Sequence, residues 1–249
     1  MAWVLLLMKA TNDGYLVVAS LAYRYYAWAI NLLEQIKDYH PDAKVCLVTE
    51  EKFCDGREEI ADHLIYCDDH YRAKLWGMAN TPFDRTFYID ADMECLHEDI
   101  ATVFDELGDN DMVFNVLEEK NYDIFMDTDW PGGKFELCGA CCLYRKEMIP
   151  FMQDWYDLYV KQYEDEWWPT DENGNWDWRT HPRRLKNWDQ FTLWWLVNKE
   201  EKYKDLKIGK FKENDRWNYW SLQHRKEPMP DNIVLYHKSF CADQKVYQS

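Results

Sequence analysis

The chain has 249 residues and a formal net charge of −17, with 46 acidic and 29 basic side chains. This charge argues against a partner with a phosphate backbone and against an anionic membrane surface. Hydrophobic residues make up 47% of the sequence, enough for a sizeable core, and no apolar stretch approaches the ~20 residues of a membrane span. We therefore expect a globular protein in which any anionic ligand is held by a local cation.

The first third of the chain alternates between apolar runs and amphipathic segments. We expect strands at 3–10, 44–49 and 63–67, with helices at 15–38 and 57–62. The first helix is predicted from apolar residues at helical spacing between Leu16 and Leu33. A turn at 11–15 precedes it, because Asn, Asp and Gly favour turns. Strands that alternate with helices predict a parallel sheet with crossover helices.

The remainder continues the same alternation to the end of the chain. We expect helices at 71–80, 97–107, 146–163 and 187–199, and strands at 86–89, 111–116, 135–144 and 232–236. The sequence shows no linker and no internal repeat, so residues 1–249 are interpreted as a single domain. The predicted fold class is α/β, with a mixed, mostly parallel sheet flanked by helices.

The most informative stretch runs from Thr86 to Asp92, where a short β-prone segment ends in two aspartates separated by Ala91. Parallel sheets place ligands at the carboxyl ends of their strands, and residues i and i+2 of an extended segment point the same way. Asp90 and Asp92 are therefore candidate ligands for one hard cation, Mn²⁺ or Mg²⁺, set against a diphosphate. The alternative is a turn that merely ends a strand.

His237 follows the last predicted strand just as the aspartates follow the central one. We expect a parallel sheet to bring both strand ends to one edge, where two carboxylates and an imidazole would form a set of Mn²⁺ ligands. Lys74 and Lys238 are candidates to counter a phosphate charge. The alternatives are a surface histidine and two solvated lysines.

Cysteine and tryptophan are the two unusual residue types in this sequence. Most of the eight cysteines lie in apolar runs, which is typical of reduced thiols in a cytoplasmic protein. Cys138 and Cys141 have the spacing of a zinc pair, but no second pair accompanies them. Four tryptophans lie in the polar segment 164–186, where they could form a surface for sugar rings or pack internally.

Taken in order, these motifs resemble the retaining, nucleotide-sugar-dependent glycosyltransferases of the glycogenin-like family 8, which have the GT-A (Rossmann-like) fold. Five segments carry the resemblance: Thr11-Asn12-Asp13-Gly14-Tyr15, Lys74-Leu75-Trp76, Pro82 to Asp92, Asp189-Gln190 and His237. The resemblance implies that Thr11, Asn12 and Tyr15 contact the base and ribose and that Lys74 reaches the phosphate or sugar.

The resemblance also assigns roles around the donor sugar. It implies a nucleotide-sugar site made of Thr11, Asn12, Tyr15, Lys74, Asp90, Ala91, Gly139 and Lys238. Asp189 and Gln190 would be the catalytic residues near the sugar, and Asp90, Asp92 and His237 would hold the metal. Two departures stand out: Leu137 occupies the place of the family's asparagine before Gly139, and Lys238 follows His237 at once instead of after a glycine.

We therefore predict a metal-dependent glycosyltransferase that moves a sugar from a nucleoside-diphosphate sugar, expected to be a UDP-sugar, to a hydroxyl acceptor with retention. Mn²⁺ is the expected metal and Mg²⁺ the alternative. Neither nucleic acid nor a membrane span is expected. Two alternatives remain: a carbohydrate-binding protein on a decayed transferase fold, and a phosphohydrolase that uses the first aspartate as nucleophile.

Overall fold

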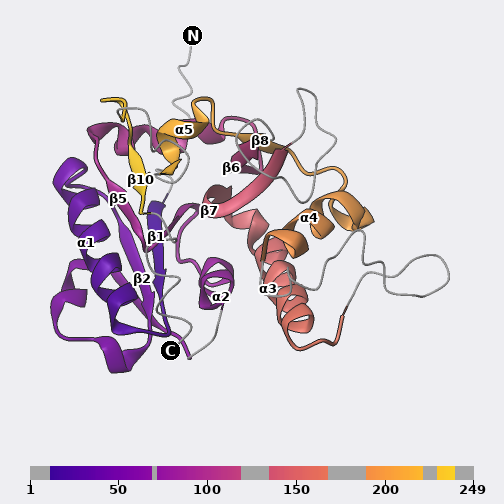
Figure 1. Ribbon diagram of the computed structural model, residues 1–249, viewed down its shortest axis with the longest axis horizontal. Coiled ribbons are helices and arrows are strands. Elements are labelled where there is room, and N and C mark those ends of the chain that lie inside the picture. Colours follow the sequence, from indigo (N-terminus) through magenta and orange to yellow (C-terminus); the bar gives the residue numbers. More distant parts are fainter. Residues whose placement is uncertain (1–11, 69–71, 119–134, 168–188, 221–228, 239–249) are drawn as a thin grey trace, which may run out of the picture.

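The computed structural model describes residues 12–68, 72–118, 135–167, 189–220 and 229–238 (Figure 1). Its main feature is a seven-stranded sheet in the order β3-β2-β1-β4-β7-β6-β8. The strands are β1 (Asp13–Ala19), β2 (Val45–Thr49), β3 (His63–Tyr66), β4 (Arg85–Asp90), β6 (Met112–Glu118), β7 (Phe135–Arg145) and β8 (Ile208–Lys210). Only β7 runs against its neighbours among these seven strands, so the prediction of a mixed, mostly parallel sheet is confirmed.

Helices cover both faces of the sheet (Figure 1). The α-helices are α1 (Tyr23–Tyr39), α2 (Ala73–Ala79), α3 (Ile149–Tyr163), α4 (Asp189–Lys199) and α5 (Asn214–Trp217). Short 3-10 segments are η1 (Glu51–Phe53), η2 (Arg57–Ile60), η3 (Glu98–Leu107), η4 (Lys146–Met148) and η6 (Glu201–Tyr203). Helix α1 and η3 pack on one face and α2, α3 and α4 on the other, because each buries one apolar stripe against the strands.

The start of the first predicted helix is wrong. Residues 15–19 belong to β1, in the middle of the sheet, and α1 begins only at Tyr23. All five residues from Tyr15 to Ala19 are apolar and buried. A run that is apolar at every position also has apolar residues at helical spacing, so its fit to a helix was fortuitous. A strand covered on both faces gives this same pattern. The strand expected at 3–10 lies outside the described residues.

A second, three-stranded sheet lies beside the main one, in the order β5-β10-β9. Its strands are β5 (Met93–Cys95), β10 (Leu235–His237) and β9 (Tyr219–Trp220). Strand β10 is antiparallel to β5 and parallel to β9. The sequence predicted the last strand but not this sheet, because two- and three-residue strands carry no periodicity that a pattern search can detect. β8 and α5 were missed for the same reason.

Candidate active site

Asp90 ends β4, which lies at the point where the strand order of the main sheet reverses. The chain runs outward from β1 to β2 and β3 and then returns to the other side of β1 as β4. Ligands of open α/β sheets bind outside the carboxyl ends of the strands at such a point. The Tyr88 hydroxyl, two residues back on the same face, donates a hydrogen bond to Asp90 Oδ1 and helps to orient the carboxylate.

His237 reaches the aspartates through the small sheet. Strand β5 begins directly after Asp92, and its antiparallel pairing with β10 places His237 opposite Met93. The Lys238 N–H donates to the Asp92 carbonyl at 3.1 Å, and His237 Nε2 lies 3.4 Å from Asp92 Oδ1. The expected meeting of these residues is thus observed. The predicted route, along parallel strands of one sheet, is wrong, because β10 ends at His237 in the small sheet and not in the main one.

The donor atoms of Asp90, Asp92 and His237 all lie within 4.8 Å of one another in a half-buried position. Burial raises the pKa of Asp90, and the neighbouring Asp92 charge raises it further against the opposing effect of Lys74. Burial also raises the pKa of Asp92, but the hydrogen bond and charge of His237 outweigh it and lower the pKa overall. Two oxygens and one nitrogen at this spacing fit a hard divalent cation, which would relieve the repulsion between the carboxylates.

Lys74, in the first turn of α2, connects the metal-ligand candidates to a third carboxylate. Its Nζ lies 2.9 Å from Asp189 Oδ2 and 3.6 Å from Asp90 Oδ1. It also donates to the Gly139 carbonyl at 3.3 Å. Burial lowers the pKa of Lys74, but the charges of Asp189 and Asp90 outweigh burial and raise it, so Lys74 stays a cation.

Asp189 begins α4 and is 95% buried. Burial raises its pKa, but Lys74 and Arg72 together reverse the shift and lower it, so the carboxylate is ionised. Arg72 Nε lies 3.4 Å from Asp189 Oδ2, an interaction that sequence reasoning missed. The neighbouring Gln190 is half-buried, and its Nε2 has no hydrogen-bond partner within the described part of the chain.

Gly139 lies inside β7 at a place where neighbouring side chains leave little room for a larger residue. The β6–β7 register breaks so that Gly139, Ala140 and Cys141 form an irregular step between two paired positions. A Cβ on Gly139 would lie 3.3 Å from the Trp155 ring and 3.6 Å from Lys74 Nζ. The Trp155 indole N–H in turn donates to the Asp189 carbonyl at 2.9 Å. The glycine therefore allows β7, α2 and α3 to meet at the site.

The structure does not bring Asn12 and Tyr15, two of the predicted base-binding residues, to this site. In the parallel β1–β4 pair, Asp13 lies opposite Arg85 and Val18 opposite Asp90, so Asn12 and Tyr15 lie at the amino end of the strands. The Tyr15 hydroxyl is buried and donates to the Ile100 carbonyl at 2.9 Å. Thr11 lies outside the described residues.

The segment that follows β1 at the carboxyl edge is 20–22, which the sequence analysis did not select. Leu21 there adopts a left-handed backbone conformation, with φ of 73°, and its side chain is 42% exposed. Its N–H donates to the buried Glu50 carboxylate at 2.5 Å. Non-glycine residues held in this conformation cluster at ligand sites. Recognising residues 15–19 as a buried strand would have pointed to this segment.

The two remaining nucleotide-sugar candidates lie close to the aspartates. Ala91 is buried between Asp90 and Asp92. The Lys238 ammonium forms an ion pair with Glu94 of β5, beside the metal-ligand candidates. Leu137, at the position where the family has asparagine, packs in the apolar cluster on the α2–α3 face, so its side chain offers the site no polar group.

Seven of the eight cysteines and Trp167 lie among the described residues. The described cysteines are all free, burial raises the pKa of the Cys138 thiol to about 12, and no cysteine belongs to a metal-like cluster of described residues. Trp167 packs against Phe191 and Trp195 of α4, while residues 168–186 lie outside the described chain. None of the described helices is long and apolar enough to cross a membrane.

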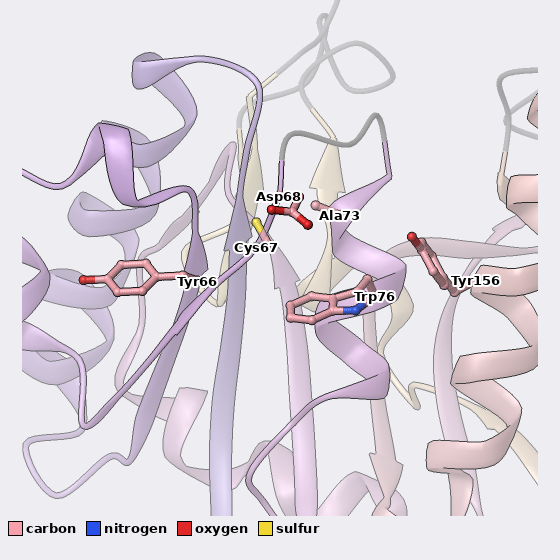
Figure 2. Close-up of a pocket in the computed structure, with 6 residues that line it drawn as sticks. All are labelled: Tyr66, Cys67, Asp68, Ala73, Trp76 and Tyr156. Atoms are coloured by element: carbon pink, nitrogen blue, oxygen red, sulfur yellow. The ribbon is translucent and has the colours of Figure 1, made fainter.

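A pocket of about 150 Å³ lies beside α2, at the carboxyl end of β3. It is lined by Tyr66, Cys67, Asp68, Ala73, Trp76 and Tyr156. Figure 2 shows Asp68 next to Ala73, the Trp76 ring below them and Tyr156 reaching in from α3, with Tyr66 turned away from the others. Because Ala73 and Lys74 are consecutive, this pocket and the charged cluster share the first turn of α2.

Comparison with known proteins bears on the fold. No protein-family model matches the sequence, and no curated protein is similar to it in sequence. The structure resembles galactosyltransferase LgtC in complex with donor and acceptor sugar analogs, at 14% identity and a TM-score of 0.54, over 90% of this chain and 86% of LgtC. A structure of an LgtC variant with an active-site Gln-to-Glu substitution is 13% identical to this chain, with a TM-score of 0.53. This match again covers 90% of this chain and 86% of LgtC.

The structure also resembles the glycosyltransferase GlyE of Streptococcus pneumoniae, at 15% identity and a TM-score of 0.52. The match covers 90% of this chain but only 54% of GlyE, so the chain spans about half the length of that protein. At these low identities the likeness establishes the architecture. The chain has the GT-A fold of glycosyltransferases.

Proposed function

We propose that this protein is a metal-dependent glycosyltransferase of the glycogenin-like family 8 type, which transfers a sugar from a nucleoside-diphosphate sugar to a hydroxyl acceptor. The observation that best supports this function is the cluster of Asp90, Asp92 and His237, with Lys74 beside it. The cluster lies where the strand order reverses in a glycosyltransferase fold. UDP is the expected nucleotide, and retention of configuration is expected from the family resemblance.

In this proposal Asp90, Asp92 and His237 hold the divalent cation, expected to be Mn²⁺, whose positive charge stabilises a leaving diphosphate. Lys74 supplies a fixed cation in the same place. Asp189 and Gly139 hold its ammonium in position at 2.9 and 3.3 Å, so it needs little reorganisation when negative charge develops on the leaving group. The chain carries −17 overall, so these local cations are what makes an anionic donor acceptable.

Asp189 and Gln190 are the proposed catalytic residues, at the start of α4. Asp189 is ionised and held by two cations, which supports a role in positioning Lys74 and Arg72 at the donor sugar. An ionised carboxylate at the reacting carbon also remains a candidate transient nucleophile. Gln190 offers its amide N–H to the sugar or acceptor. The active-site glutamine of LgtC supports a test of this residue.

The pocket beside α2 supports a carbohydrate as the acceptor. The Trp76 and Tyr156 rings and the Asp68 carboxylate are among the groups that line it, and flat apolar faces combined with a few polar groups suit a sugar ring (Figure 2). Its volume of about 150 Å³ fits a single ring and not a long chain.

The deciding experiment is thermal unfolding with UDP, with Mn²⁺ and with both, on wild type and on Asp92→Ala. A ligand bound by the folded state alone raises the midpoint by mass action. We expect a shift that needs both additions and that is absent in Asp92→Ala. Asp231→Ala, at an exposed position, is the matched control. A shift with free sugar that ignores both metal and UDP would favour the binding-protein alternative.

Transfer itself is tested by UDP release from UDP-sugars with mono- and disaccharide acceptors. The anomeric configuration of the product, read by NMR, then tests retention. Release of inorganic phosphate from simple phosphate esters, with no transfer of a sugar, would overturn the proposal in favour of the phosphohydrolase.

A further inference from the structure

Three asparagines connect the interior of the main sheet to His237. Asn218 precedes β9, Asn115 lies in β6, and Asn214 begins α5. Asn115 and Asn218 are 98% and 94% buried. Buried amides must satisfy both their donor and their acceptor, so their orientation carries information about their neighbours.

The backbone of Val116 fixes the orientation of the Asn214 side-chain amide. The Val116 N–H donates to Asn214 Oδ1 at 2.8 Å, and Asn214 Nδ2 donates to the Val116 carbonyl at 2.9 Å. A backbone N–H can only donate and a carbonyl can only accept, so the Asn214 amide has one possible orientation. Its Oδ1 is therefore an acceptor, and the group of Asn115 that lies 2.9 Å from it must be the NH₂.

The orientations of the Asn115 and Asn218 amides follow from that of Asn214. With its NH₂ on Asn214, Asn115 presents Oδ1 to Asn218, and Asn218 Nδ2 donates to it at 2.8 Å. Asn218 therefore presents its own Oδ1 to His237 Nδ1, at 3.0 Å. An amide oxygen cannot donate, so Nδ1 of His237 must carry the proton.

This leaves Nε2 as the nitrogen that faces the carboxylates. In a neutral imidazole with a proton on Nδ1, Nε2 is a bare lone pair, and it lies 3.4 Å from Asp92 Oδ1. A lone pair and a carboxylate repel each other unless a proton, as in the imidazolium, or a metal cation lies between them. The Trp220 ring stacks on the imidazole, with a centroid distance of 5.9 Å and an interplanar angle of 24°.

We propose that Asn214, Asn115 and Asn218 form a relay that holds His237 in the Nδ1–H tautomer, so that Nε2 is preset to bind a cation together with Asp90 and Asp92. Asn218 is thus a positioning residue for the metal ligand. The role of this tautomer in binding a cation rests on the proposed metal-dependent function. The tautomer itself is a property of the metal-free protein, and it is tested without metal or substrate.

The test is the ¹⁵N NMR spectrum of the histidine side chains in metal-free protein, at a pH where His237 is neutral. The His237 signals are assigned by their loss in His237→Gln. We expect Nδ1 of the pyrrole type and Nε2 of the pyridine type in wild type. An Nε2–H tautomer in wild type would overturn the relay, whether or not the protein binds metal.

Variants separate positioning from mere structural support. Asn218→Leu removes the acceptor, and we expect His237 to shift toward the Nε2–H tautomer and Mn²⁺ affinity to fall about tenfold or more. Asn218→Asp keeps an oxygen acceptor opposite Nδ1 of His237, so this variant should show the Nδ1–H tautomer that Asn218→Leu loses. Asn198→Leu, at an exposed position on α4, is the matched control. If Asn218→Leu lowers the metal-free unfolding midpoint and leaves the tautomer unchanged, Asn218 is only structural and the proposal fails.

A wild type that shows the Nδ1–H tautomer but binds neither Mn²⁺ nor Mg²⁺ by calorimetry would confirm the relay and contradict the proposed metal site. The two failures are therefore distinguishable.

Discussion

His237 and Asp92 lie side by side, with 3.4 Å between Nε2 and Oδ1, because β10 pairs with the strand that begins directly after Asp92. Two residues that lie 145 positions apart in the sequence are thus held together by a backbone ladder and not by a flexible loop. Sites built on paired strands keep their side chains within a narrow range of positions. This pairing explains how an acidic protein can hold two carboxylates and an imidazole ready for one cation.

The pH dependence of metal binding follows from this pair. Burial lowers the pKa of His237, but the hydrogen bond and charge of Asp92 outweigh burial and raise it above the ordinary value of about 6.5. Protonated His237 stabilises the metal-free fold below about pH 6.5, and this contribution is lost as pH rises through the raised pKa. A cation needs Nε2 without its proton, so Mn²⁺ affinity should rise over that same range.

Calorimetric titration with Mn²⁺ from about pH 5.5 to 8 measures this dependence, since about 6.5 is the unperturbed value for histidine. The variant His237→Gln should bind more weakly and lose most of the slope. A wild-type affinity that does not change with pH would contradict the prediction.

The role of Asp189 is tested by Asp189→Asn. The substitution keeps the shape of the side chain and removes the charge that holds Lys74 at 2.9 Å. We expect turnover to fall by about 100-fold or more, as for the loss of one preorganised electrostatic group, while UDP affinity in the presence of Mn²⁺ is retained. Steady-state UDP release and UDP titration measure the two quantities.

The matched control is Asp154→Asn, because Asp154 is also ion-paired, with Lys202, but lies on the surface of α3. Unchanged turnover in Asp189→Asn would exclude a catalytic role for this residue.

Lys74 should be essential to the stability of the site as well as to its chemistry. Lys74→Met leaves the carboxylates of Asp189 and Asp90 without their shared cation, and loss of one partner of a buried pair costs about 3 kcal/mol. Adding Asp189→Asn should recover part of this loss, and the double-mutant cycle measures the coupling free energy. Urea denaturation of metal-free protein gives each value.

Lys202→Met serves as the comparison, because surface pairs contribute at most about 1 kcal/mol. Equal losses for Lys74→Met and Lys202→Met would show that the Lys74 cluster is no stronger than a surface pair.

The strand assignment of residues 13–19 has its own test at Gly14. A Cβ at this position would lie 2.3 Å from the ring of buried Phe83, so Gly14→Ala should destabilise the protein by about 1–3 kcal/mol. The second substitution Phe83→Leu should recover part of the loss in Gly14→Ala while costing stability on its own. Simple additivity of the two changes in urea denaturation would contradict this contact.

The pocket beside α2 is tested by Trp76→Ala. Removal of the ring should raise the KM for a sugar acceptor while the joint UDP and Mn²⁺ shift in the unfolding midpoint stays the same, because Trp76 lines the pocket and not the charged cluster. Tyr39→Ala is the comparison, since Tyr39 is 43% exposed at the end of α1 and is not among the residues that line the pocket. An unchanged acceptor KM in Trp76→Ala would remove the pocket from the proposal.

Local patterns in the sequence were sufficient to predict the central strand with Asp90 and Asp92 at its end and a mostly parallel sheet. They also predicted helices at 146–163 and 187–199, where the structure has α3 (Ile149–Tyr163) and α4 (Asp189–Lys199). These features depend on the apolar spacing of neighbouring residues, which differs between helix and strand. The same rule failed at residues 15–19, because a run that is apolar at every position satisfies both spacings.

Only the tertiary structure showed how distant residues meet. The reversal of β7 and its irregular step at Gly139, the Arg72–Asp189 contact and the β5–β10 pairing depend on which strand lies beside which. The direction of the asparagine relay depends in turn on a chain of hydrogen bonds that begins at the backbone of Val116. Such pairings are decided by burial and hydrogen bonding across the whole fold, so no local pattern encodes them, whereas the identity of the two aspartates and their place at a strand end were determined by the sequence alone.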